Sequence, residues 1–112
     1  MMMVKERNSG SGWFVYHRDL GATKFLPLHD TTQAQTETGT TSCWFETEPT
    51  DLVFTVGQNG ATNDNDRPII AYCWTEVEGF SKFGEYKGNG TTTRNGLLVY
   101  CGFKPAFVML RN

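Results

Sequence analysis

A succession of short β-rich runs, each closed by a cluster of turn residues, is the feature that most constrains this chain. The runs recur at roughly 8–12-residue intervals, which is typical of sandwiches and barrels. No window repeats apolar residues at helical spacing over three turns, so the sequence predicts no long helix. The expected strands are residues 1–5, 13–17, 24–28, 43–45, 51–56, 68–77, 97–101 and 106–110.

Some of these runs are apolar on both faces. In residues 69–74, one face would carry Ile69, Ala71 and Cys73, and the other Ile70, Tyr72 and Trp74. Runs of this kind belong inside layered sheets or at subunit contacts. The polar segments 30–42 and 57–67 are expected to be surface loops. The pattern predicts an all-β fold, an antiparallel β-sandwich of jelly-roll type, with residues 1–112 as a single module.

The two ends of the chain are similar in sequence. When the chain is shifted by 106 positions, Met2, Met3, Val4 and Lys5 align with Val108, Met109, Leu110 and Arg111. This pattern is short enough for chance to remain an explanation. If it is real, the chain is one unit of a tandem repeat.

Charge and cysteine content exclude several classes of protein. The net charge is −2 and no Lys/Arg cluster is present, so neither nucleic acid nor a membrane surface is an expected partner. No apolar run approaches the ~20 residues of a membrane span. The odd count of three cysteines, without a CxxC motif, fits neither a disulfide framework nor a zinc site. We therefore expect reduced thiols, a cytoplasmic place of folding and no signal peptide.

Aromatic side chains are candidates for ligand contact, since each ring offers an apolar face and a polar edge. Trp44 adjoins the long polar segment, so it is the tryptophan expected to be exposed. Tyr86 is a second candidate for the same site. Trp13 and Trp74 lie in expected strands and are more simply explained as core residues.

The polar segment 57–67 supplies the remaining candidates, Asn63, Asp64 and Asp66. Oxygen ligands at this density could hold calcium, as in some lectins, but Asn and Asp are also ordinary turn formers. Their spacing does not match the EF-hand pattern. We predict ligand contact here without a metal or other cofactor.

One carboxylate pair raises the possibility of glycan hydrolysis. Jelly-roll glycosidases of the retaining type carry an E-x-D-x-x-E strand motif, and residues 76–81 read E-x-E-x-x-S. Glu76 and Glu78 would share a strand face, with Cα atoms roughly 6.5–7 Å apart. Ser81 replaces the third carboxylate, so we favour two solvated glutamates and predict that the chain is not an enzyme.

Several segments resemble, in order, a domain family of unassigned function found in bacteriophage proteins described as tail fibres or lectin-like. The string GFSKFG, then YxGNG, then GFxPAxVM is specific for this resemblance. The segments are residues 13–17, 20–24, 70–74, 78–84, 86–90 and 102–109.

The resemblance implies a concanavalin-A-like jelly roll in a virion appendage, assembled in the host cytoplasm. Implied partners are other virion proteins, copies of the chain and a host surface glycan. The resemblance implies no active site. Members of the family are long and multi-modular, whereas a single module of this size could equally decorate a capsid as a cement protein. Both alternatives remain open at this point.

Overall fold

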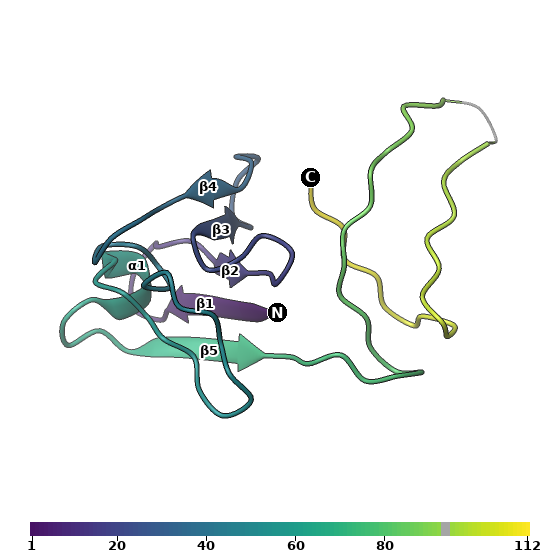
Figure 1. Cartoon of the computed structure of the whole chain (residues 1–112). Coiled ribbons are helices and arrows are strands. Elements are labelled where there is room, and N and C mark those ends of the chain that lie inside the picture. Colours follow the sequence, from purple (N-terminus) through teal and green to yellow (C-terminus); the bar gives the residue numbers. More distant parts are fainter. Residues whose placement is uncertain (93–94) are drawn as a thin grey trace.

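A computed structural model describes residues 1–92 and 95–112, and most of their regular structure is β-strand. The strands form one antiparallel sheet of five, in the order β4-β3-β2-β1-β5 (Figure 1). The prediction of an all-β chain is confirmed. No helix in this part of the chain is long and apolar enough to cross a membrane. The elements are β1 (Met2–Glu6), β2 (Phe14–Tyr16), β3 (Lys24–Pro27), β4 (Gln35–Thr36), α1 (Gly60–Asn63) and β5 (Ile69–Cys73).

Strand β1 lies between β2 and β5, and its side chains alternate between two environments. Met2, Val4 and Glu6 are buried, whereas Met3 and Lys5 are half-buried. Alternation follows from the two-residue period of a strand, which sends successive side chains to opposite faces. The register continues this pattern into β2, where Met2 pairs with the buried Tyr16, whereas on the other side Met2 pairs with Cys73, which is exposed.

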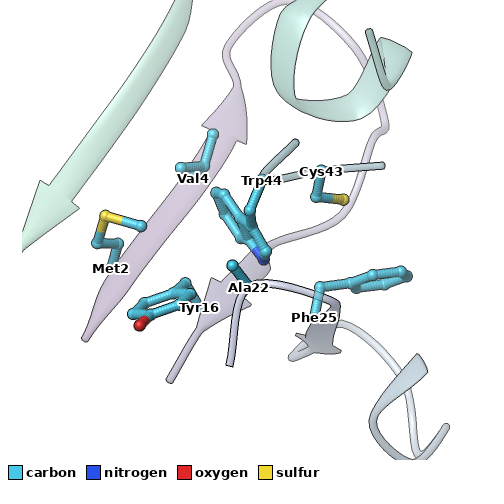
Figure 2. Close-up of a cluster of buried hydrophobic side chains, with 7 residues drawn as sticks. All are labelled: Met2, Val4, Tyr16, Ala22, Phe25, Cys43 and Trp44. Carbon is cyan, nitrogen blue, oxygen red and sulfur yellow. The ribbon is translucent and has the colours of Figure 1, made fainter. Parts of the chain in front are cut away.

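The core lies on the Met2–Val4 face, where a loop covers the sheet (Figure 2). Trp44 is only 1% exposed, its ring meets Tyr16 edge-on at 6.1 Å between centroids, and its indole N–H donates to the Lys24 carbonyl at 3.0 Å. The prediction that Trp44 is exposed is therefore wrong. Phe45 and Glu46 adopt positive φ angles of 52° and 51°, which turn the chain immediately after Trp44. That turn leaves the indole against the sheet although Trp44 comes just after the long polar segment 30–42.

Close backbone packing holds this loop against the segment before α1. The Gly57 N–H donates to the Cys43 carbonyl at 3.0 Å, and Glu37 accepts the Cys43 N–H at 3.0 Å. Asn59 caps α1 by accepting the Ala61 N–H at 2.9 Å. The predicted loop 57–67 thus contains one helical turn, because an Asn side chain satisfies an otherwise free N–H at that point.

Beyond Trp74 the chain leaves the sheet as an extended arm, described over residues 75–92 and 95–112, which projects to one side of the five-stranded body (Figure 1). The radius of gyration is 15.7 Å and the extents are 50 × 30 × 26 Å. A compact domain of this length would have a radius of about 13 Å. The arm accounts for the difference.

Four expected strands are absent from the structure. Residues 43–45, 51–56, 97–101 and 106–110 are assigned to no strand. The reason is that a β-rich sequence forms a strand only where another backbone pairs with it. Apolar side chains on the arm are left exposed as a result, among them Leu98 (97%), Tyr100 (83%) and Phe107 (80%).

Candidate functional site

Three aromatic rings form a row on the sheet face opposite the core. The Trp13 and Tyr72 ring centroids are 6.0 Å apart, and so are those of Tyr72 and Trp74, whose planes are within 19° of parallel. Tyr72 is 43% exposed and Trp74 is 42% exposed. The Lys5 ammonium lies 5.9 Å from the centroid of the Trp13 ring. We call Trp13, Tyr72 and Trp74 the ring row.

Strand alternation explains why these rings share a face. Tyr72 and Trp74 are two residues apart at the end of β5, and Tyr72 pairs with Met3 of β1. Trp13 directly precedes β2 and has the same parity as Val15, which pairs with Met3 from the other side. The odd-numbered positions of β1 and β2 and the even-numbered positions of β5 therefore lie on the same face of the sheet.

The expectation that Trp74 belongs to the core is wrong, since the end of β5 lies at the margin of the sheet. Trp13 is half-buried. Sequence reasoning did not select Tyr72 as a site residue, although the alternation of Ile70, Tyr72 and Trp74 was visible. The missing information was that Trp13, 59 positions before Tyr72, packs beside it.

Chemically, the ring row offers apolar faces, an indole N–H, a phenol and a nearby ammonium. Such a surface can stack on the apolar face of a sugar ring or pack against an apolar protein segment. The Lys5 ammonium also donates to the Ser11 carbonyl at 2.6 Å, which fixes its position beside Trp13.

The residues predicted to bind a ligand do not come together. Trp44 is in the core, so its ring has no face free for stacking, and Tyr86 is on the arm, 48% exposed. Asn63, Asp64 and Asp66 are exposed at the end of α1. Asp64 is within 3.6 Å of the Arg67 guanidinium, and Asp66 accepts from the Asn65 amide at 3.0 Å. In residues 1–92 and 95–112, no three His, Cys, Asp or Glu side chains are grouped to hold a metal.

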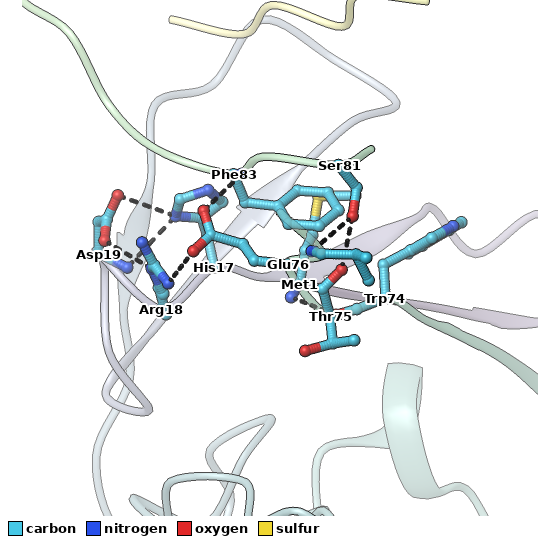
Figure 3. A network of polar contacts seen from close by, with 10 residues as sticks. Met1, His17, Arg18, Asp19, Trp74, Thr75, Glu76, Ser81 and Phe83 are labelled. Atoms are coloured by element: carbon cyan, nitrogen blue, oxygen red, sulfur yellow. Dashed lines mark hydrogen bonds and ion pairs between the residues drawn. The ribbon is translucent and has the colours of Figure 1, made fainter. Parts of the chain in front are cut away.

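A polar network anchors the start of the arm to the turn after β2 (Figure 3). The Arg18 guanidinium donates to Glu76 at 2.7 Å, and Glu76 also accepts the Phe83 N–H at 2.9 Å. The Ser81 hydroxyl donates to the Thr75 carbonyl at 2.9 Å, which closes the bend at residues 75–81. Both carboxylate oxygens of Glu76 are therefore occupied.

The other end of the arm is held by Arg111. Its guanidinium donates to the carbonyls of Pro27 at 3.4 Å, Asp30 at 3.0 Å and Thr32 at 2.5 Å. These contacts bring the C-terminal residues to the end of β3. The arm is thus attached to the body near both of its ends.

Glu76 and Glu78 line a pocket of about 390 Å³ at the base of the arm, between residues 76–82 and 100–103. The expectation that both lie on one strand is wrong, because β5 ends at Cys73 and the chain bends at residues 77–81. The hydrogen bond from the Phe83 N–H and the Arg18 guanidinium lower the pKa of Glu76. A general acid needs the opposite shift, so these observations do not favour hydrolysis. The prediction that the chain is not an enzyme stays a prediction.

The three cysteines are free, and they differ in exposure. Cys43 is 1% exposed in the core, where burial raises the pKa of its thiol. Cys73 is exposed on β5 and Cys101 is half-buried on the arm. The apolar surroundings expected for Cys73 are therefore missing in this structure.

The described part of the chain has an all-β body, an exposed ring row and a tethered arm with exposed apolar side chains. The chain belongs to the family described as domain of unknown function DUF7483, which it matches over residues 1–112. No curated protein and no solved structure matches it.

Proposed function

We propose that this protein is a structural module of a bacteriophage virion, in a tail fibre or similar appendage, and that it works by assembling with copies of itself and with other virion proteins. The observation that carries the proposal is the arm, whose apolar side chains are exposed beside a sheet with open edges. Leu97, Leu98, Val99 and Tyr100 are between 47% and 97% exposed. Contiguous apolar surface of this kind marks interaction sites in proteins.

The sequence resemblance to phage tail-fibre and lectin-like modules supports the same proposal. It also supports a finer fold assignment, a β-sandwich of jelly-roll, concanavalin-A-like type. The β-rich arm segments 97–101 and 106–110 are the candidates for further strands of such a sandwich. In this proposal they pair when the module meets its neighbours in a virion assembled in the host cytoplasm.

Immunogold electron microscopy of intact particles tests the virion assignment. An antibody raised against the module should label the tail or its fibres. Label spread over the head would favour the alternative, a capsid decoration protein. Particles that carry no label, from a phage that encodes the module, would contradict both assignments.

A second candidate function, recognition of a host surface glycan, is favoured by the ring row. The Tyr72 and Trp74 rings are near parallel and exposed, and the Lys5 ammonium lies by the neighbouring Trp13 ring, an arrangement suited to stacking on a saccharide. Glycan-array screening followed by calorimetry tests it. Trp74→Ala should weaken binding about two- to tenfold, since a stacked aromatic ring contributes about 0.5–1.5 kcal/mol. Tyr86→Ala is the matched control, because Tyr86 is equally exposed and lies on the arm. Equal binding by parent and Trp74→Ala would remove the ring row from the site.

A further inference from the structure

The outer edge of β5 is open, because β5 is the last strand of the sheet. Trp74 donates its N–H to the Met1 carbonyl at 2.9 Å, and Arg7 donates to the Pro68 carbonyl at 2.9 Å, both across the β1–β5 ladder. Backbone groups alternate along a strand, so Ile69, Ala71 and Cys73 direct theirs to the open edge. The strand Ile69–Cys73 contains no charge and no proline, the features by which proteins usually blunt an edge.

One segment of the arm forms no strand and is similar in sequence to β1, the strand that pairs with the inner edge of β5. Residues 108–111 align with Met2–Lys5 of β1, the strand that already pairs with β5. The two positions that β1 directs into the core, Met2 and Val4, correspond to Val108 and Leu110. These two side chains are 61% and 67% exposed on the arm. Residues 108–111 therefore have apolar side chains at the same alternate positions as β1, and they belong to no strand of the sheet.

We propose that residues 107–111 of one copy pair antiparallel with the open edge of β5 in a second copy, as a sixth strand. Val108 then lies beside Cys73, and Leu110 beside Ala71, on the core side of the sheet. Met109 lies beside Tyr72 on the ring-row side, where its sulfur meets the phenol ring. This inference rests on the proposed self-assembly and specifies its partner and its geometry. Addition of a strand to a sheet edge uses main-chain hydrogen bonds for affinity and side-chain alternation for register.

The arrangement within one copy favours a second copy as the partner. Arg111 holds the C-terminal residues at Pro27, Asp30 and Thr32, at the end of β3. In the sheet order, β2 and β1 separate β3 from β5. Three interstrand spacings amount to about 14 Å, so the segment lies away from its own β5 edge. Docking releases the three Arg111 contacts, which are made to backbone carbonyls at the surface.

Site-directed crosslinking of the full chain tests the register. In the docked pair, the introduced thiol of V108C faces the native Cys73 thiol at a separation that a disulfide can span. Mild oxidation should yield a 73–108 disulfide, identified by peptide mapping. M109C is the matched control, because residue 109 is directed to the opposite face. Its crosslink to Cys73 should form at least about five-fold less.

Mixing ¹⁴N- and ¹⁵N-labelled V108C protein before oxidation distinguishes the possible partners. Mixed-isotope crosslinked peptides are expected, because the two thiols come from different molecules. A 73–108 disulfide found only within single chains would overturn the second copy as partner. Equal crosslinking by V108C and M109C would overturn the register and with it the proposal.

Ala71→Pro provides an independent test by sedimentation. It removes an N–H that points to the open edge and leaves the ladder to β1 intact. We expect dimer formation to weaken about tenfold or more, with an unchanged circular dichroism spectrum. If the parent chain associates and Ala71→Pro associates equally well, the edge is not the contact, although the virion assignment stands. Unlabelled virions in the immunogold experiment would instead count against the virion assignment.

Discussion

The Arg18 guanidinium lies 2.7 Å from the Glu76 carboxylate, and this ion pair joins the turn after β2 to the start of the arm. It connects residues 58 positions apart, and both side chains are partly exposed, at 56% and 33%. Exposed pairs of this kind contribute little to global stability. Its role in this protein is therefore positional, since it determines where the arm leaves the sheet.

Glu76→Ala should loosen the arm without unfolding the body. The substitution removes the acceptor for both Arg18 and the Phe83 N–H. We expect faster amide exchange at Phe83 and little change in unfolding free energy. Glu78→Ala is the control, which should leave Phe83 exchange unchanged. Parent-like exchange at Phe83 in Glu76→Ala would show that the ion pair does not anchor the arm.

The same anchor should persist into mildly acidic solution. The Phe83 N–H first, and then Arg18, lower the pKa of Glu76. Because the pKa of Glu76 is lower in the folded protein, its charged form stabilises the contact at pH values above the ordinary glutamate pKa. This contribution is lost as the pH falls through the folded-state pKa. An NMR titration of the Phe83 amide should therefore have its midpoint below the ordinary glutamate pKa. In Arg18→Met the midpoint should rise only part of the way, because the Phe83 hydrogen bond is the larger cause. A full return to the ordinary value would contradict this order of causes.

Gly57→Ala should destabilise the body strongly. A Cβ atom at this position would lie 1.9 Å from the Ser42 carbonyl oxygen and 3.0 Å from that of Thr40. Both contacts are to backbone, so the loop that carries Cys43 and Trp44 would have to move. We expect a loss of about 2 kcal/mol or more in chemical denaturation. Gly60→Ala is the control, since nothing lies within 4 Å of its Cβ, and it should be neutral or slightly stabilising. Equal stability of the two variants would mean that the loop does not pack as described.

Trp44→Ala should have a large effect on folding. The side chain is 1% exposed and packs between Tyr16, Val4 and Cys43. Truncation of a buried tryptophan to alanine costs about 3–5 kcal/mol. Trp44→Phe should cost less, because it keeps an aromatic ring and loses the indole hydrogen bond to Lys24. Thermal unfolding monitored by circular dichroism measures both variants. A change below about 1 kcal/mol in Trp44→Ala would place this residue outside the core.

Strand β1 and its partner β5 were predictable because both lie largely within short β-rich runs, residues 1–5 and 68–77, each closed by turn residues. Such runs are visible in the local sequence. The expected strands 13–17 and 24–28 are also confirmed. They contain β2 (Phe14–Tyr16), which is shorter by one residue at each end, and β3 (Lys24–Pro27), which ends one residue earlier.

The candidate site was harder to predict, since it depends on residues distant in sequence. Trp13 and Tyr72 meet only because β1 separates and aligns β2 and β5. The prediction for Trp44 was wrong because the positive φ angles at Phe45 and Glu46 cannot be read from the sequence. Neither residue type prefers the left-handed region, so tertiary packing must impose that conformation.

By itself, the sequence determined the β-rich character of the chain, the places of its first and fifth strands, and the recurrence of the β1 pattern at residues 108–111. These properties follow from side-chain shape and spacing. Only the tertiary structure decided which β-rich runs become strands, because a strand needs a second backbone to satisfy its N–H and C=O groups. Residues 2–6 have such partners on both sides, whereas residues 97–101 and 107–110 have a similar composition and remain an exposed arm.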